Sequence, residues 1–433
     1  MILQEKISAQ LPRWRERVKV LVEEHGETVI DQVKIAQVYG GMRGIKSLVS
    51  DISFVDPATG IKFRGMSIPE VLEKLPRPED ASIPYVGALF YLLMVGEIPT
   101  QDEAKAVEAE WARRASVPAY VYDVLRAMPK ETHPMVLFSQ AVLALQTGSE
   151  FARQYSAGIK KEDYWKPTLE DALNLTAKLP AIAAFIYRFK YGDGKEPKYD
   201  PQQDYGANFA RMMGVKDEKG YADLARLYFI LHSDHESGNV SAHTTHLVGS
   251  ALSDAYYAFS AGLNGLAGPL HGLANQECLG WLISVRDKFG GVPSREDLYK
   301  FAWDTLDSGK VIPGYGHAVL RVTDPRFTAQ LEYAKKHFPQ DTLVQLAELV
   351  YDVVPQVLKE QGKAKNPAPN VDAISGTLQY YYGVREFDFY TVLFGVGRAL
   401  GVMSNLVWAR ALGQPIERPK SLTTAMLEEA AGK

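Results

Sequence analysis

The hydrophobic positions of this chain recur mostly at helical spacing. In the first segment, apolar residues repeat at that spacing up to a natural stop at Gly26: Ile7, Leu11, Trp14, Val18 and Leu21. This pattern predicts an amphipathic N-terminal helix. Proline and glycine residues separate further predicted helices at 70–74, 85–95, 101–115, 119–127, 177–191, 221–230, 273–289, 329–337, 342–360 and 390–412. Thr100, with Glu103 after it, is predicted to cap one of them through a capping box.

One segment alternates between apolar and polar residues instead. It reads ISFV from Ile52, turns at residues 56–60 (DPATG) and resumes as IKFR. Two alternating runs around a Pro/Gly turn predict a β-hairpin. Because little else favours strands, we expect an all-α fold with one minor N-terminal hairpin.

Length and charge narrow the class of protein. With 433 residues, the chain is long enough for two or three domains, and 46% hydrophobic with 23% charged residues is typical of a globular protein. A formal net charge of −4 gives no global basic footprint, so nucleic acid is not expected as a partner. No run of about 18 apolar residues is free of charge, so we expect no membrane span.

The chain has a single cysteine, Cys278, which excludes an intrachain disulfide and a cysteine-based zinc cluster. This usage fits a reducing compartment such as cytosol or mitochondrial matrix. The first residues lack the apolar core of a secretory signal and contain several glutamates, unlike an acid-poor transit peptide.

Histidines gather between residues 232 and 271. The pairs His232/His235 and His243/His246 have i, i+3 spacing, so each pair could share one helical face and bind a metal. No HExxH element is present, and no acidic ligand lies at a familiar spacing. Structural hydrogen bonding and substrate contact therefore stand as alternatives to a metal site.

His271 follows Gly268-Pro269-Leu270 and precedes a predicted helix. Near a helix N-terminus the imidazole is kept neutral and can donate a hydrogen bond to developing negative charge. The alternative is a histidine that caps the helix.

Asp372 ends an irregular segment fixed by Pro367 and Pro369. A carboxylate placed there is a candidate general base, or else the N-cap of a helix from about Ala373. The preceding residues 362–366 (GKAKN) offer cations and backbone donors for phosphates, or are ordinary solvated surface.

The segment VIPGYGHAVLRVTDPR, residues 311–326, places His317 after Gly314 and Gly316, which let the backbone approach a ligand closely. Arg321 and Arg326 follow within ten residues of His317, the second after an Asp-Pro turn signal. An imidazole, which can transfer protons, beside two planar guanidinium groups, which bind anions, predicts a site for a small carboxylate or phosphate.

Arg398 interrupts an otherwise apolar helix, and the nearest acid before it, Asp388, is ten residues earlier. A buried guanidinium without a partner is costly, so an anion must meet it. That anion is either an acid from elsewhere in the fold or a substrate carboxylate.

Several long motifs resemble the citrate synthase family, most closely its mitochondrial, eukaryotic-type members. They are SDHE continuing to NVSAH from Ser233, NGLAGPLHG from Asn264, GYGHAVLR with DPR from Gly314, PNVD from Pro369, and ERPK from Glu417. The likeness extends from about Arg13 to Ser421.

The resemblance implies a citrate synthase that condenses acetyl-CoA with oxaloacetate and hydrolyses citryl-CoA to citrate and CoA, at the start of the tricarboxylic acid cycle. His271 resembles the histidine that stabilises the enol(ate) of acetyl-CoA, and Asp372 the base that removes its methyl proton. His317 resembles the histidine that protonates the oxaloacetate carbonyl. No metal or permanently bound cofactor is implied.

The family's binding residues also have counterparts here. Those that hold oxaloacetate or citrate carboxylates match His235, Arg326, Arg398 and, from the neighbouring subunit of a homodimer, Arg418. The CoA-binding positions match Arg43, Lys161, Leu270, Val311, Gly314, Gly316, Arg321, Lys363, Ala364, Lys365 and Asn370. The resemblance also implies a large domain (1–273 and 377–433), a small domain (274–376) that closes over substrates, and a location in the mitochondrial matrix or a bacterial cytoplasm.

Three positions depart from the family pattern: Ser237 stands for Gly, Ile374 for His, and Lys161 for Arg. Lys161 keeps its charge but loses bidentate geometry. Competing interpretations are a 2-methylcitrate synthase that uses propionyl-CoA, a metal-dependent hydrolase built on the histidine pairs, and a non-enzymatic helical scaffold.

Overall fold

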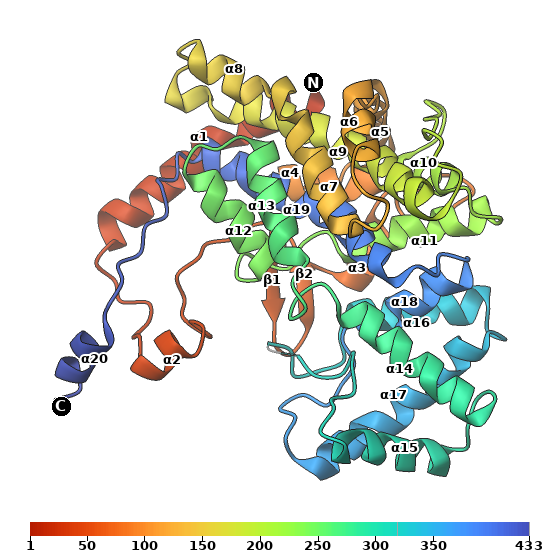
Figure 1. Ribbon diagram of the computed structural model, residues 1–433. Coiled ribbons are helices and arrows are strands. Elements are labelled where there is room, and N and C mark those ends of the chain that lie inside the picture. The colour runs from red at the N-terminus through yellow and green to blue at the C-terminus, as the bar shows by residue number, and fades with distance from the viewer. Residues whose placement is uncertain (318, 433) are drawn as a thin grey trace.

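The computed structural model describes residues 1–317 and 319–432. It is built almost wholly from helices (Figure 1). The first ten are α1 (Ile2–His25), α2 (Ile35–Tyr39), α3 (Ile68–Lys74), α4 (Val86–Val95), α5 (Gln101–Arg114), α6 (Ala119–Arg126), α7 (Pro134–Ala144), α8 (Glu150–Ser156), α9 (Trp165–Tyr191) and α10 (Tyr205–Met213). The others are α11 (Glu218–Leu231), α12 (Val240–Ser250), α13 (Ala255–Leu266), α14 (Ala274–Phe289), α15 (Arg295–Asp307), α16 (Pro325–His337), α17 (Thr342–Gln361), α18 (Asp372–Tyr381), α19 (Tyr390–Ala411) and α20 (Thr424–Ala430).

The predicted hairpin is confirmed, and so is the all-α fold class. Strands β1 (Ser53–Asp56) and β2 (Gly60–Phe63) pair antiparallel around the turn. A short third strand, β3 (Met66–Ser67), extends the sheet and was not predicted. The capping box at the start of α5 is confirmed as well: Thr100 Oγ1 accepts the Glu103 N–H at 3.2 Å, and Glu103 accepts the Thr100 N–H at 2.9 Å.

Two long helices, α9 and α19, pack together at the centre of the upper body (Figure 1). The segment from Phe387 to Ala411 is apolar and long enough to cross a membrane by composition, but 89% of its apolar window is buried inside the protein, as in a core helix. Helix α9 begins at Trp165, earlier than the predicted start at 177. Its first half carries polar residues such as Asp171, which is buried because it accepts hydrogen bonds from Ser149 and the backbone of Glu150.

Helices α14 to α18 pack against one another and lie together below this upper body (Figure 1). The contacts that join them to the upper body include the hairpin turn: the Arg321 N–H donates to Pro57 O at 2.8 Å. Helix α11 makes another such contact, where Tyr333 Oη donates to Gly220 O at 3.0 Å.

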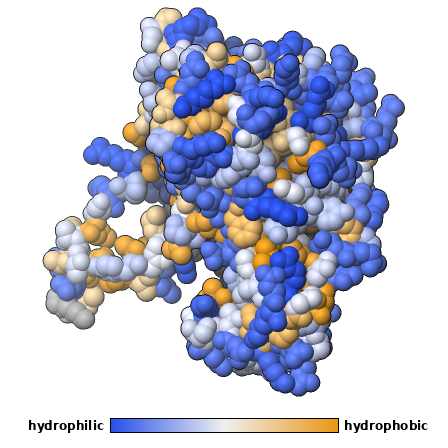
Figure 2. Space-filling model, turned by 45° about the vertical axis from the view of Figure 1, so that its right-hand side comes forward, coloured by the Kyte–Doolittle hydropathy of each residue, from blue (hydrophilic) through white to orange (hydrophobic). Residues whose placement is uncertain are grey.

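The segment around α2 and the C-terminal segment that ends in α20 form an arm that stands away from the body, whereas the N-terminus lies on the body (Figure 1). In Figure 1, α2 and α20 lie side by side there, and Tyr39 Oη is 2.8 Å from Thr424 Oγ1. Figure 2 shows hydrophobic residues on this arm. The predicted N-terminal helix and its stop at Gly26 are confirmed, but its apolar face is not buried throughout: Leu21 is 60% exposed, because α1 leaves the body before its end.

Candidate active site

A hydrogen-bonded pair of loops joins the predicted histidine segment to the start of α18. Gly316 N donates to Ala368 O at 3.1 Å, and Asn370 N donates to Gly314 O at 2.9 Å. The close approach of a ligand to the backbone at Gly314 stays a prediction, and the structure gives this glycine a second role. Gly314 has φ +79°, and a Cβ there would lie 2.8 Å from Ala373 Cα, so the glycine is required by packing against α18.

His317 is held as a hydrogen-bond donor toward the site. Its Nδ1 accepts the N–H groups of Val319 at 3.0 Å and Leu320 at 2.9 Å, so the ring proton of the neutral imidazole is on Nε2. Burial, together with nearby Arg326, lowers the pKa of His317 to about 4. The ring is therefore neutral near pH 7.

His271 is held in the opposite tautomer. Its Nε2 accepts the Ser241 N–H at 3.3 Å and lies 2.9 Å from Ser241 Oγ, which leaves the proton on Nδ1. Burial and Arg398 lower the pKa of His271 to about 4. Helix α14 begins at Ala274 with Leu273 at the N-cap, so the alternative of a capping histidine is wrong.

Asp372 is the first residue of α18, and its carboxylate is not used as a cap. Asn370 Oδ1 accepts the Asp372 N–H at 3.0 Å and so takes that role; the N-cap alternative for Asp372 is wrong. Within the described residues, the carboxylate accepts no hydrogen bond. Burial raises the pKa of Asp372 to about 6, although the positive charges of Arg326 and Arg398 act against the increase.

Arg398 lies buried in α19 with unsatisfied donors. Its side chain is 2% exposed, and Asp234 Oδ1 is 3.8 Å from its Nη1, too far for a hydrogen bond. Nε and Nη1 have no hydrogen-bond partner among the described residues. A tertiary acid is therefore present near this arginine, and the binding of a substrate carboxylate by its remaining donors stays a prediction.

Arg326 is oriented by Asp324, the N-cap of α16. Nε donates to Oδ1 at 3.0 Å and Nη2 to Oδ2 at 2.7 Å, a bidentate pair in which both side chains are almost fully buried. This pairing fixes the guanidinium plane.

His235 follows α11 and lies beside the loop that carries His317, called the histidine loop below. The centroids of the two rings are 5.4 Å apart. Its neighbour Asp234 accepts Ser53 Oγ–H at 2.6 Å, and Ser53 Oγ in turn accepts the Glu236 N–H at 2.7 Å. These contacts tie the β1 strand to the turn that carries His235.

Electrostatic interactions show which predicted residues the fold brings together. Arg326 perturbs the pKa values of His235, His317 and Asp372. Arg398 perturbs those of His235, His271 and Asp372. Two arginines thus share one site with three histidines and one carboxylate.

Four supporting residues were not identified as functional from the sequence: Ser53, Asp234, Ser241 and Asp324. Asp234 and Ser241 lie within the motifs around His235 and His243, which was the available signal. Ser53 carried no signal, because its contact with Asp234 spans 181 residues.

Other predicted binding residues lie outside this cluster. The side chains of Arg43, Lys161 and Arg418 are exposed, and no hydrogen bond or ion pair joins them to the residues above. The predicted CoA-binding loops are largely exposed too: Leu270 fully, Val311 at 78%, together with Lys363 and Lys365. Asn370 Nδ2 donates to Gly316 O at 3.0 Å, so this side chain positions the two loops.

The histidine pairs do not form a metal site in the part of the chain that the structure describes. His232 and His235 do not share a helical face, because α11 ends at Leu231. His232 Nδ1 is 2.9 Å from Tyr228 O, and His243 Nε2 is 2.8 Å from Glu417 Oε1. These two histidines are engaged in structural contacts.

Comparison with known proteins gives consistent matches. The family description "Citrate synthase, C-terminal domain" matches residues 41–420. The mitochondrial citrate synthase of Saccharomyces cerevisiae is 53% identical over 431 residues, 100% of this chain and 90% of that protein. The corresponding protein of Xiphias gladius is 51% identical, over 99% of this chain and 92% of its own.

Solved structures agree on the fold. Citrate synthase from Pyrobaculum aerophilum superposes with a TM-score of 0.77 at 25% identity, over 89% of this chain and 92% of that one. The Thermoplasma acidophilum enzyme, solved as a ternary complex with carboxymethyl coenzyme A and oxaloacetate, gives 0.74 at 22% identity, over 91% of this chain and 97% of its own.

Proposed function

Because the chain belongs to the citrate synthase family, we propose that the cluster around Arg326 and Arg398 is where acetyl-CoA is condensed with oxaloacetate. Each relative reported above is named for citrate synthase, and nothing points to a 2-methylcitrate synthase. The observation that carries the proposal is the pair of neutral histidines in opposite tautomers beside a carboxylate that accepts no hydrogen bond from a described residue.

We assign one task to each of the three groups. Asp372 removes a proton from the thioester methyl group, and the Nδ1–H of His271 donates to the developing enolate oxygen. The nucleophilic carbon then attacks the oxaloacetate ketone, whose oxygen takes the proton from Nε2 of His317. Water cleaves the citryl thioester to give citrate and CoA.

Neutral imidazoles suit these roles because each has one N–H to donate. Were His271 protonated, Nε2 would carry a proton and could no longer accept the Ser241 N–H. Since burial and an arginine keep the pKa of each ring at about 4, the required form dominates near pH 7.

The substrate carboxylates are bound by Arg326, Arg398 and His235. Arg398 has the buried, unsatisfied N–H groups that a carboxylate would accept from. Arg326 is already aligned by Asp324 and presents a fixed guanidinium plane. The CoA moiety lies along the exposed loops that carry Leu270, Val311 and residues 363–365, with Arg321 beside them.

Release of CoA thiol from acetyl-CoA tests this function, with and without oxaloacetate and in buffer containing EDTA, with propionyl-CoA in parallel. We expect fast, oxaloacetate-dependent release that prefers acetyl-CoA and is unaffected by EDTA. Preference for propionyl-CoA would contradict the substrate assignment, and absence of release with either thioester would contradict the function.

We also propose that residues 274–376 form a small domain that closes onto the rest of the chain. The range begins at the first residue of α14 and ends inside α18, which continues to Tyr381, and α14 to α18 pack mainly with one another. His317 and Asp372 lie on that part, while His235, His271 and Arg398 lie on the other, so closure completes the site. Crystals with and without oxaloacetate would show different interdomain angles; equal angles would contradict closure.

The arm supports a homodimer in which Arg418 completes the partner subunit's site. Val29 is 77% exposed and Ile30 70%, so these side chains lack cover within one chain. Arg418 lies on the exposed stretch between α19 and α20, with no contact to its own site. An arm of this kind embraces a second copy and carries Arg418 to it.

Subunit complementation tests the shared site. Arg418→Ala and His317→Ala homodimers are both expected to be nearly inactive. Co-expression forms heterodimers in which one site has His317 together with Arg418 from the partner, so about one quarter of all sites recover activity. Recovery of none would contradict the shared site.

The mitochondrial names of the relatives support a location in the mitochondrial matrix. Fractionation of the source cells with an antibody against this chain tests it; signal confined to the cytosol would contradict the assignment.

A further inference from the structure

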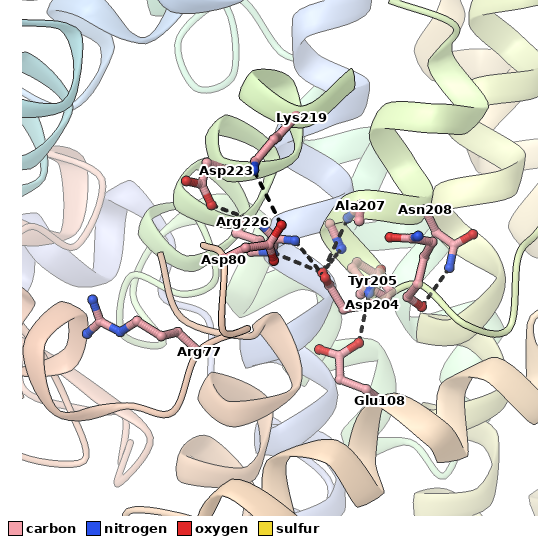
Figure 3. Close-up of polar contacts among 12 residues, drawn as sticks. Arg77, Asp80, Glu108, Asp204, Tyr205, Ala207, Asn208, Lys219, Asp223 and Arg226 are labelled. Carbon is pink, nitrogen blue, oxygen red and sulfur yellow. Dashed lines mark hydrogen bonds and ion pairs between the residues drawn. The ribbon is translucent and has the colours of Figure 1, made fainter. Parts of the chain in front are cut away.

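A cavity lies in the upper body of the molecule, away from the residues of the candidate active site. It has a volume of about 620 Å³ and is bordered by α5, α10, α11 and the segment before α4 (Figure 3). None of the predicted catalytic or substrate-binding residues lines it. The proposal that follows therefore does not depend on the condensation chemistry.

The buried wall of this cavity carries more negative than positive charge. Arg226 donates to Asp204 Oδ2 at 2.6 Å and to Asp223 Oδ1 at 2.7 Å, and all three side chains are at most 13% exposed. Glu108, 8% exposed, is the third carboxylate of the wall (Figure 3). One guanidinium therefore faces two aspartates and the Glu108 carboxyl group.

Glu108 is held by backbone donors and by no cation. Its Oε1 accepts the Gly87 N–H and its Oε2 the Tyr205 N–H, each at 2.8 Å. Each oxygen keeps a lone pair for another donor. The carboxylate is thus fixed in place with capacity to bind a further group.

The basic residues at the mouth do not neutralise this wall. Lys219 forms an ion pair with Asp80 at 3.5 Å, and Arg211 with Asp200. Lys105 is exposed to solvent on α5. The excess negative charge deeper in the cavity remains.

Tyr85 supplies an independent sign of a missing ligand. Its side chain is 8% exposed and lines the cavity, yet its hydroxyl forms no hydrogen bond with any described residue. The hydroxyl lies within electrostatic range of Asp204 and Glu108. Because the side chain lines the cavity and its hydroxyl has no partner among the described residues, the hydroxyl is available to a bound molecule.

We propose that this cavity binds a small organic cation, with a protonated primary amine held by Glu108, Asp204 and the Tyr85 hydroxyl. An ammonium group has three N–H donors and no acceptor, so it can donate to oxygens of these three side chains. The volume accommodates an aliphatic chain beyond the ammonium group. A metal ion is a poorer match, because no described group of three His, Cys, Asp or Glu residues is arranged to hold one.

Isothermal titration of the full-length protein with putrescine tests the proposal, and butane-1,4-diol is the neutral control of the same length. We expect saturable binding of putrescine and none of the diol. Tyr85→Phe, which removes only the hydroxyl, weakens binding about 10-fold. Glu108→Gln weakens it further, whereas Asp102→Asn, an exposed carboxylate change on the same helix, leaves it unchanged.

Proton release gives a second readout. Burial and the nearby Asp204 raise the pKa of Glu108 to about 8, while the Gly87 and Tyr205 N–H groups and Arg226 act against the increase. A bound ammonium stabilises the carboxylate form, so binding near pH 7 releases a proton and affinity increases as the pH rises toward about 8. The other titratable groups that interact with this carboxyl are Tyr85, Tyr199 and Tyr205.

Titration in two buffers of different ionisation enthalpy measures that release, and Glu108→Gln abolishes it. Equal binding of the diol, unchanged putrescine affinity in Tyr85→Phe, or absence of proton release in the wild type would each overturn the proposal. Unchanged circular dichroism of both variants shows that weaker binding does not reflect misfolding.

Discussion

At the scale of single residues, the site depends on how neighbours orient each group. Two histidines have similar burial and similarly lowered pKa values, yet they present different nitrogens to the site. The difference comes from the backbone N–H groups of Ser241 and of Val319 and Leu320. Local hydrogen bonds, and not residue type, decide which nitrogen donates.

Asp372 should set the acidic limb of the pH profile. Because its pKa is about 6 and a base acts as the anion, kcat/KM rises as the pH increases through about 6 and then levels off. Asp372→Asn lowers kcat by roughly 10²–10⁴-fold and removes this limb. Thiol release measured between about pH 5 and pH 8 checks both; a limb that persists in the variant would contradict the assignment.

The same carboxyl should lower stability above its pKa. The pKa of Asp372 in the folded protein lies above the ordinary 3.8, so ionising this carboxyl lowers the free energy of unfolding. The loss is absent below about pH 4 and complete above about pH 6, where it amounts to about 3 kcal/mol. Asp372→Asn therefore has a higher free energy of unfolding than the wild type at pH 8 and a similar one at pH 4. Denaturant titration at both values measures the difference, and equal stabilities at pH 8 would exclude this penalty.

Arg398→Lys keeps the charge but loses the planar fork. We expect the KM for oxaloacetate to increase roughly 10- to 100-fold, because one carboxylate loses its bidentate partner. Arg410→Lys is the matched control: it lies on the same helix, is also buried, and donates to Ser253 O away from the site. An equal change in both variants would mean that Arg398 acts through packing.

At the scale of elements, the site is assembled from loops held together across the sequence. The histidine loop and the segment before α18 form one hydrogen-bonded unit, so His317 and Asp372 move together. His271 and Arg398 belong to the other part of the molecule. Contacts between the two parts, such as the hairpin turn against Arg321 and Pro325, fix how these groups face each other.

Gly314→Ala should disturb this unit. Its Cβ would lie 2.8 Å from Ala373 Cα and 2.9 Å from Cys278 Sγ, on a backbone with φ +79°, so the loop or the start of α18 must shift. We expect kcat to fall at least 10-fold, since small misplacements of reacting groups are costly. Gly309→Ala, with φ +80° and open space around it, isolates the backbone strain and should leave kcat nearly unchanged.

At the scale of the whole molecule, apolar residues remain exposed on the arm. The arm of α2 and α20 is held by few contacts of its own, and exposed apolar residues continue along it. Arg418 lies at the base of that arm and is exposed. A second copy of the chain would cover these apolar residues, and Arg418 would complete the active site of that copy.

Ending the chain after Leu422 removes α20 and tests the role of the arm. We expect the dimer dissociation constant to rise at least 10-fold and activity to become dependent on protein concentration. Sedimentation velocity and dilution assays measure this. Tyr39→Phe, which removes only the hydrogen bond to Thr424, should have a small effect, and a truncated chain that dimerises as tightly as the full one would refute the role.

The sequence by itself determined the helical class, the hairpin and the positions of eleven of the twenty described helices, because periodicity, capping residues and glycine stops act over a few neighbouring residues. It underestimated α9, whose first half is buried through polar contacts such as Asp171 with Ser149. It also singled out the histidines, arginines and Asp372 as candidates for the site, since long motifs preserve residue types in order.

Only the tertiary structure decided how those residues act. The tautomer of His271 depends on Ser241, thirty residues away, and the pairing of Asp234 with Ser53 spans 181 residues. The raised pKa of Asp372 and the unsatisfied N–H groups of Arg398 follow from burial, which no local pattern specifies. Hydrogen-bond geometry and desolvation are set by three-dimensional neighbours, and so they became visible only once the chain was folded.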